Sequence, residues 1–175
     1  MLNALEGKPR IKLLACDVDG VLTDGGMYFG VEGQMMKRFN VKDGLGMALL
    51  RDSGVKIAFI SADSSEICRV RGEKLCVHDI CFGVTNKAAA LQELMARDGL
   101  TADEVVYVGD DLPDLCLAPL VGLFVAPADA VDEIKQVAGY VTRQPGGHGA
   151  IREVCDAIRK HNGSVGAPAS SRQCR

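Results

Sequence analysis

Two carboxylates separated by one residue follow an apolar run near the start of the chain. Residues 12–16 read Lys-Leu-Leu-Ala-Cys, and Asp17 and Asp19 come directly after them. Such a run is typical of a buried parallel strand, which would deliver Asp17 to the carboxyl end of a sheet, where open α/β sheets bind ligands. Two carboxylates aimed at one point repel each other unless a cation or phosphate chemistry accompanies them. A strand followed by an ordinary turn explains this pair equally well, because Asp and Gly are common turn residues.

Polar groups also follow two later apolar runs, and one opens a helical stretch. Ser61 follows residues 55–60, Asp110 and Asp111 come just after residues 105–108, and Lys87 precedes an Ala- and Leu-rich segment. Because parallel strands share one carboxyl edge, we expect these groups to line one pocket with the first pair. Crowded carboxylates suit a hard cation that keeps several waters, which indicates Mg²⁺. The chain lacks the spacing of a calcium-binding loop and the Gly-rich loop of nucleotide hydrolases.

The elements that must position these groups alternate between strands and helices. This alternation predicts an α/β fold, a Rossmann-like three-layer sandwich with a mostly parallel sheet and helices on both faces. A Gly-containing turn at residues 30–33 joins two further strands into a β-hairpin. The expected strands cover residues 12–16, 27–29, 34–41, 55–60, 77–82, 105–108, 123–125 and 140–142, and the expected helices cover residues 43–50, 67–75, 87–96, 115–120, 130–137 and 149–160.

Length and composition restrict the class of protein. With 175 residues the chain fits one domain, which we expect over residues 1–162, and the Gly-, Ser- and Pro-containing stretch 163–175 reads as a disordered tail. A net charge of −3 argues against a nucleic-acid-binding surface, so the expected partner is a small molecule or another protein chain. We expect no membrane contact and a cytoplasmic location, because the first ten residues lack the apolar core of a signal peptide and no long apolar run follows.

Taken together, the motifs resemble a known enzyme superfamily. The stretches 17–25 and 109–114, together with Ser61 and Lys87, look like the four motifs of the haloacid dehalogenase (HAD) superfamily of phosphatases. The stretches 39–44 and 146–153 resemble signatures of its capless branch, typified by 3-deoxy-D-manno-octulosonate 8-phosphate (KDO 8-phosphate) phosphatases. The resemblance covers about residues 12–159 in the right order, which is more specific than any single motif.

The resemblance implies a Mg²⁺-dependent phosphomonoester hydrolase that works through an aspartyl-phosphate. Asp17 would be the nucleophile, and Asp19 would protonate the leaving oxygen and then take a proton from water. Ser61 and Lys87 would hold the phosphoryl oxygens. The metal ligands would be Asp17, the backbone carbonyl of Asp19, and Asp110. Asp111 or Asp114 would orient the metal shell.

The implied substrate is a 2-keto-3-deoxy sugar acid phosphate, KDO 8-phosphate in lipopolysaccharide biosynthesis, but Asp63 departs from the branch pattern. That pattern places Arg here, which could pair with the sugar carboxylate, whereas Asp63 would repel it. Positive charge would then come from Arg71, Lys74 or Lys42. An acidic residue here is closer to phosphatases of nonulosonate (KDN or N-acylneuraminate) 9-phosphates, which remain an alternative, as do a non-catalytic assembly domain and an Asp63 that merely caps the next helix. The remaining expected substrate-binding residues are Thr23 and Gly25.

The hairpin of about residues 26–41 stands where larger relatives would carry a cap domain. In the resembled branch, tetramers place the hairpin of one subunit over the active site of the next, which would exclude bulk water. We therefore expect a homotetramer with Tyr28, Phe29 and Met35 as contact residues. The alternative is a hairpin that packs only on its own subunit.

Overall fold

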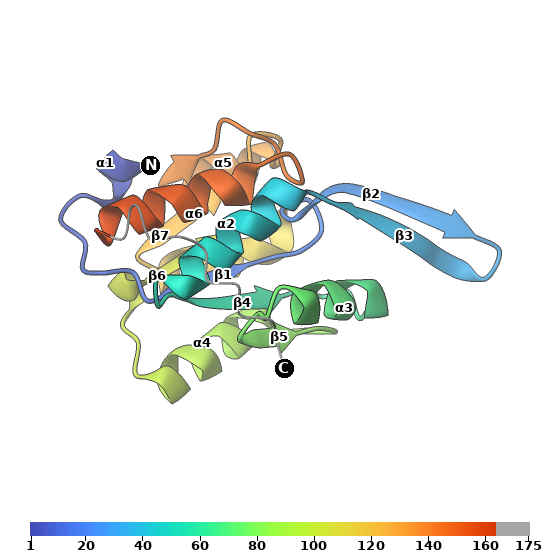
Figure 1. Ribbon diagram of the computed structural model, residues 1–175, viewed down its shortest axis with the longest axis horizontal. Coiled ribbons are helices and arrows are strands. Elements are labelled where there is room, and N and C mark those ends of the chain that lie inside the picture. The colour runs from blue at the N-terminus through green and yellow to red at the C-terminus, as the bar shows by residue number, and fades with distance from the viewer. Residues whose placement is uncertain (164–175) are drawn as a thin grey trace.

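Six parallel strands form the central sheet of the protein (Figure 1). The computed structural model describes residues 1–163, apart from the side chain of Met35. The strand order is β5-β4-β1-β6-β7-β8, and every neighbouring pair is parallel. The expected α/β class is confirmed. The strands are β1 (Leu13–Cys16), β4 (Lys56–Ile60), β5 (Asp79–Cys81), β6 (Val105–Val108), β7 (Leu123–Ala126) and β8 (Tyr140–Val141).

Alternating side chains of the strands supply two separate cores, one on each face of the sheet. On β1, Leu14 and Cys16 join the core that includes residues of α2, α3 and α6, whereas Leu13 and Ala15 join the core that includes residues of α4, α5 and η2. The continuous apolar runs reflect burial on both faces, and the result is the expected three-layer sandwich. The helices are α1 (Leu2–Leu5), α2 (Val41–Asp52), α3 (Glu66–Lys74), α4 (Lys87–Asp98), α5 (Asp132–Val137) and α6 (Ala150–His161), with 3₁₀ helices η1 (Ala102–Glu104) and η2 (Leu112–Leu120).

The strand order reverses at β1, which lies between β4 and β6. The chain leaves β1 toward β4 and β5 and later returns to β6 on the other side. Adjacent loops therefore diverge at this point, which is where open α/β sheets leave a crevice for ligands. The backbone N–H of Asp17 donates to the carbonyl of Val108 over 3.0 Å, so the carboxyl ends of β1 and β6 stay together.

The structure differs from the expected elements in a few places. The helix expected over residues 115–120 is a longer 3₁₀ helix that begins at Leu112, with Pro113 in its first turn and Pro119 inside it. Prolines lack the N–H that a regular α-helix would need at an interior position. The four-residue helix α1 was not expected, because it is too short to show a period. The tail expected over residues 163–175 lies, from residue 164 onward, outside the described residues.

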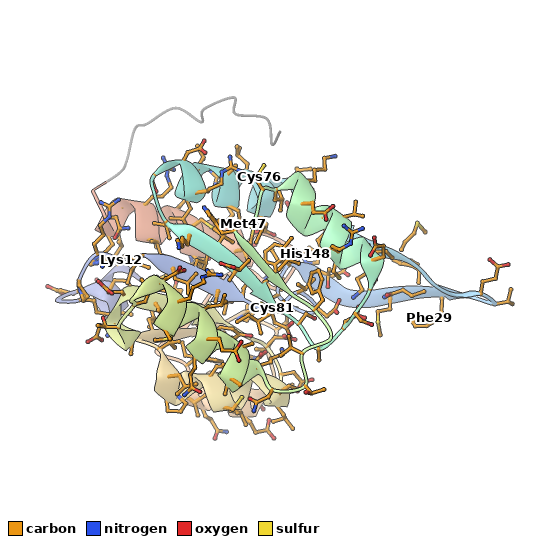
Figure 2. The ribbon with its side chains drawn as sticks, turned by 90° about the horizontal axis from the view of Figure 1, so that it is seen from below. Lys12, Phe29, Met47, Cys76, Cys81 and His148 are labelled. Atoms are coloured by element: carbon orange, nitrogen blue, oxygen red, sulfur yellow. The ribbon has the colours of Figure 1, made fainter. Side chains whose placement is uncertain are left out.

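The hairpin consists of β2 (Thr23–Gly30) and β3 (Gly33–Phe39) and projects away from the sheet and helices (Figure 1). It begins before the expected residue 26, and residue 41 already belongs to α2. Phe29 lies toward its outer end, far from the body of the protein (Figure 2). Its exposed apolar side chains are Met27, Tyr28, Phe29, Val31 and Met36. No helix in residues 1–163 is long and apolar enough to cross a membrane.

Candidate active site

Lys87 joins the carboxyl end of β1 to the loop after β6. Its Nζ donates to Asp17 Oδ2 over 2.7 Å and to Asp114 Oδ1 over 2.8 Å. The residue is the first of α4, where Asn86 caps the helix by accepting from the N–H of Ala89. Burial by itself lowers the pKa of Lys87, but the two carboxylates outweigh it and the pKa lies above its ordinary value. The ammonium is therefore charged and fixed in place.

Asp114 is fully buried, and its hydrogen bonds connect it to other residues at the carboxyl edge of the sheet. Besides Lys87, it accepts from the hydroxyl of Tyr107 over 2.8 Å and from the N–H of Asp110 over 3.1 Å. Tyr107 was missed by the sequence reasoning. A tyrosine inside an otherwise all-valine buried strand was the available signal, because a buried hydroxyl needs a partner. Asp111, in contrast, is exposed and caps η2 through the N–H of Leu112.

Asp17, Asp110 and Asp114 offer carboxylate oxygens that lie within 4.8 Å of one another. Burial and the charge of Asp114 raise the pKa of Asp17 to about 6, although Lys87 acts in the opposite direction. Burial and repulsion by Asp17 and Asp114 raise the pKa of Asp110 to about 8. Within residues 1–163, no group donates a hydrogen bond to the Asp110 carboxylate. A divalent cation fits these residues, because it would supply the positive charge that this acidic set lacks.

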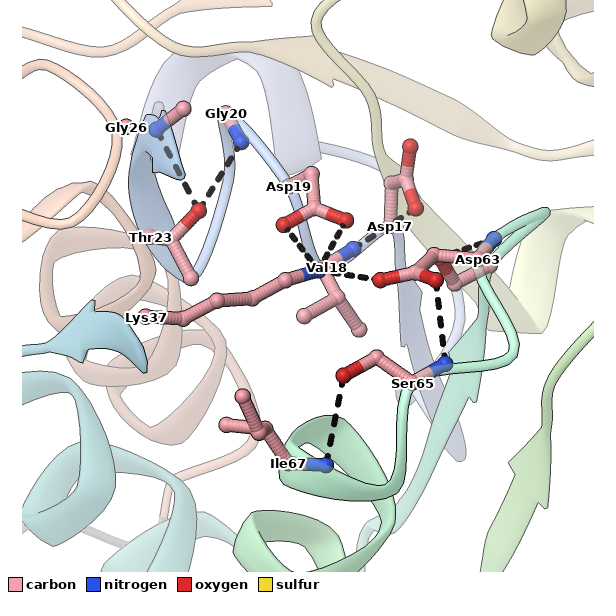
Figure 3. Close-up of polar contacts among 12 residues, drawn as sticks. Asp17, Val18, Asp19, Gly20, Thr23, Gly26, Lys37, Asp63, Ser65 and Ile67 are labelled. Atoms are coloured by element: carbon pink, nitrogen blue, oxygen red, sulfur yellow. Dashed lines mark hydrogen bonds and ion pairs between the residues drawn. The ribbon is translucent and has the colours of Figure 1, made fainter. Parts of the chain in front are cut away.

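Asp19 belongs to a second group of charges next to the first (Figure 3). Lys37 of β3 extends between Asp19 and Asp63, with its Nζ 2.7 Å from both carboxylate oxygens of Asp19 and also donating to Asp63 Oδ2. The sequence reasoning missed Lys37. The signal was its position two residues before Phe39, since alternate residues of a strand share one face and Phe39 packs against the core.

Ser61 and Asp63 lie in the loop after β4. Ser61 is buried, and its Oγ accepts from the N–H of Asp63 over 3.2 Å. Asp63 Oδ1 accepts from the N–H of Ser65, but the residue that caps α3 is Ser65, whose Oγ accepts from the N–H of Ile67. The interpretation of Asp63 as the helix cap is therefore wrong. Its second carboxylate oxygen faces Lys37 instead.

Thr23 and Gly25 shape the loop after β1. The Thr23 side chain is fully buried, and its Oγ1 accepts from the N–H groups of Gly20 and Gly25 over 3.3 and 3.2 Å. Gly20 has a positive φ of 73°, and a Cβ on it would lie 1.9 Å from Asp110 Oδ2. A Cβ on Gly146 would lie 1.8 Å from the carbonyl oxygen of Gly20. Close packing of glycines thus sets the loop geometry, and the structure gives Thr23 a role inside the loop.

The two stretches that resemble the capless branch meet each other in space. Asp43 of α2 is buried, and its carboxylate accepts from the N–H groups of Gly149 and Arg152 over 3.2 and 2.7 Å. The Asn40 side chain donates to the carbonyl of Gly147 over 3.2 Å. These contacts hold residues 147–152 against the start of α2.

In residues 1–163, none of the three cations expected near the substrate forms an ion pair with Asp63. Arg71 is half-buried, with its guanidinium carbon 5.5 Å from the ring centroid of Phe39, and burial lowers its pKa. Lys74 is exposed at the last residue of α3, eight residues from the start of that helix, which is roughly 12 Å along the axis. Lys42 is exposed and lines a groove with Arg143 and His148 on another part of the surface. Within one subunit, Lys37 is the ammonium that reaches Asp63.

Comparison with known proteins identifies the family to which the chain belongs. Residues 55–153 match the model of the haloacid dehalogenase-like hydrolases. The chain is 40% identical over 156 residues to the 3-deoxy-D-manno-octulosonate 8-phosphate phosphatases of Yersinia pestis and Escherichia coli K12, covering 89% of this chain and 83% of each relative.

Solved structures agree with this match. The crystal structure of the Yersinia pestis phosphatase has a TM-score of 0.90 at 38% identity and covers 96% of this chain and 90% of that one. The Moraxella catarrhalis phosphatase, solved with magnesium ion, phosphate ion and KDO, has a TM-score of 0.88 at 36% identity and covers 93% and 94%. The acidic set fits the same ion, so Mg²⁺ is the cofactor. The chain belongs to the haloacid dehalogenase-like hydrolases and is a phosphatase.

Proposed function

We propose that this phosphatase hydrolyses KDO 8-phosphate through an aspartyl-phosphate on Asp17. The observation that carries the proposal is the contact of Lys87 with Asp17 after β1 and with Asp114 of η2, beside the Asp110 carboxylate, to which no group in residues 1–163 donates a hydrogen bond. The names of the relatives, at 40% identity over most of the chain, support the choice of sugar.

Each residue of the site has a chemical task in this proposal. Asp17 attacks phosphorus, and Lys87 and Ser61 bind the phosphoryl oxygens and offset their charge. Asp19 gives a proton to the leaving oxygen and later takes one from water. Asp17, the backbone carbonyl of Asp19, and Asp110 would hold Mg²⁺, which neutralises charge between the phosphate and the carboxylates. Asp114 orients Lys87 and the loop of Asp110.

The substrate is the first matter to test, because the acidic residue at position 63 also favours a nonulosonate 9-phosphate. We expect wild type to release phosphate faster from KDO 8-phosphate than from a nonulosonate 9-phosphate, measured as kcat/KM with Mg²⁺. In Asp63→Arg the ratio of the two values should change about tenfold or more, the equivalent of one charge-assisted hydrogen bond. If the wild-type enzyme prefers the nine-carbon substrate, that substrate takes the place of KDO 8-phosphate in the proposal. An unchanged ratio would remove Asp63 from sugar recognition.

Asp17→Asn should abolish turnover while keeping the fold, because it removes the nucleophilic charge and nearly preserves the volume of the side chain. We expect kcat to fall by about a thousandfold or more, measured by phosphate release. Circular dichroism should show the same content of helix and strand as wild type. A variant that keeps a tenth of the activity would exclude Asp17 as the nucleophile.

Mg²⁺ should stabilise the folded protein, and more strongly at higher pH. Folding raises the pKa of Asp110 from the ordinary value of 3.8 to about 8, so the metal-free protein loses stability as the pH rises between these two values, because in this range only the folded state keeps the proton. Because Mg²⁺ takes the place of that proton, the rise in Tm on adding Mg²⁺ should be larger at pH 8.5 than at pH 6.

The control for this measurement separates the site from general charge effects. Asp110→Asn should lose most of the Mg²⁺-dependent rise in Tm, whereas Asp132→Asn, at a residue whose side chain is 91% exposed on α5, should keep it. Equal responses of wild type and Asp110→Asn would remove Asp110 from the ligand set.

We also propose that the protein is a homotetramer in which the hairpin of one subunit covers the active site of the next. The support is the exposed apolar surface of the hairpin, where Phe29 is 67% and Tyr28 is 53% exposed. Clustered apolar side chains of this kind are typical of protein–protein contacts. Met35, also expected there, has no described side chain.

Replacing Tyr28 and Phe29 together by Ser should weaken the assembly and lower activity, because the hairpin would no longer bury these rings against a neighbour. Light scattering at micromolar concentration should give a tetramer for wild type and smaller species for the double variant. Val137→Ser, at an exposed apolar residue of α5, is the matched control and should remain tetrameric. A fully active wild-type monomer would refute this assembly.

A further inference from the structure

Lys37 is a lysine whose side chain is completely buried at the root of the hairpin. Lysine is almost never fully buried unless it is paired, and here the ammonium contacts both oxygens of Asp19 and one of Asp63 (Figure 3). Among residues 1–163, no other ion pair involves the Asp19 carboxylate. The acid–base group of the site is therefore held by a strand that lies outside the central sheet.

The geometry of β3 explains why this lysine points inward. Lys37 and Phe39 share the face that meets the body of the protein, whereas Met36 and Arg38 are exposed. On β2, Thr23 pairs with Phe39 and Met27 pairs with Lys37, so the register of the two strands shifts just beside Lys37. Such a bulge re-aims side chains next to a site. The root of the hairpin, where β2 and β3 meet the body of the protein, thus places the Lys37 ammonium beside Asp19.

The contact of the ammonium with both oxygens is the one that the Asp19 carboxylate makes once its proton has left, and it fixes the orientation of that group. In the first half of the proposed reaction, an oxygen of Asp17 bonds to phosphorus and the bond from phosphorus to the sugar oxygen breaks. The proton of Asp19 moves to that sugar oxygen. Asp19 then carries a full negative charge beside an ammonium that already contacts it, so no group has to reorient at that moment.

In the second half, the same carboxylate acts as a base. The oxygen of water bonds to phosphorus, one proton of the water moves to Asp19, and the bond from Asp17 to phosphorus breaks to release inorganic phosphate. In both halves Lys37 acts on the proton transfer through its contact with Asp19.

We propose that Lys37 is the positioning residue for Asp19, and that the hairpin thereby contributes to acid catalysis within its own subunit. The inference rests on the proposed role of Asp19. It predicts that replacing Lys37 lowers kcat/KM by a factor that depends on the leaving group of the substrate, because only a poor leaving group needs a proton. A residue that mattered only for folding would affect all substrates alike.

The test compares kcat/KM, which reports the steps up to departure of the leaving group, for two substrates with Mg²⁺ present. One is the sugar acid phosphate that wild type hydrolyses best, and the other is p-nitrophenyl phosphate, whose leaving group departs as a stable anion. For Lys37→Met we expect a fall of about a hundredfold on the sugar phosphate, within the range of general acid catalysis, and a fall of less than about threefold on p-nitrophenyl phosphate. Lys37→Arg should recover part of the loss.

Two further variants keep the result interpretable. Arg38→Met removes the neighbouring cation of β3, which pairs with Asp24, and should leave both values within about twofold of wild type. Lys37→Met/Asp63→Asn removes the repulsion between the two carboxylates that Lys37 leaves behind, and the difference between substrates should persist in it. Equal losses on both substrates, or no loss, would overturn the role of Lys37 and leave the proposed function intact. If the wild-type enzyme hydrolyses no sugar phosphate, both the role of Lys37 and the proposed function are wrong.

Discussion

The ammonium of Lys87 stands between two carboxylates that repel each other. At an effective dielectric constant of about 20, two unit charges about 4.8 Å apart repel by roughly 3 kcal/mol, and Asp17, Asp110 and Asp114 all lie within that distance. Lys87 donates hydrogen bonds to Asp17 and Asp114, and its charge also acts on Asp110, but burial and the charges of Asp17 and Asp114 outweigh it there and raise the pKa of Asp110 to about 8. The carboxylates of the site thus repel one another, and a divalent cation would relieve this repulsion.

The rest of the fold serves to hold these charges in place. The reversal of strand order at β1 brings Asp17 and Asp110 to one point, and the alternation of β6 turns Tyr107 toward Asp114. Gly20 leaves space for the Asp110 carboxylate, and Gly146 allows the loop after β1 to pack closely. A side chain at Gly20 would collide with the Asp110 carboxylate, and one at Gly146 would collide with the carbonyl oxygen of Gly20. The hairpin adds Lys37, so Asp19, the proposed acid–base residue, is oriented by a different element than Asp17, the proposed nucleophile.

The strands, the helices and the polar residues at strand ends could be predicted from the sequence, because each of them has a local sequence pattern. Asp17, Asp110 and Lys87 could be placed together from the rule that parallel strands share a carboxyl edge, and the structure brings them together. Tyr107 and Lys37 could not be assigned partners in this way, since their contacts join residues that are 7 and 18 positions apart through the packing of separate elements. Arg71 and Lys74 were chosen by nearness in sequence, but the cation that pairs with Asp63 is Lys37, which comes from the hairpin. The alternative interpretation of Asp63 as a helix cap is wrong because Ser65, two residues further on, takes that position, and propensity does not distinguish the two residues.

The central claim is that Asp17 receives the phosphoryl group while Lys87 turns from a structural ion pair to a ligand of that group. A crystal structure with Mg²⁺ and beryllium trifluoride, a mimic of a phosphoryl group on a carboxylate, tests it directly. The account predicts beryllium bonded to an oxygen of Asp17, Mg²⁺ on Asp17 and Asp110, and fluorine atoms in contact with Lys87 and Ser61. Beryllium bonded to another carboxylate, or Lys87 in contact only with Asp114 and no fluorine, would contradict it.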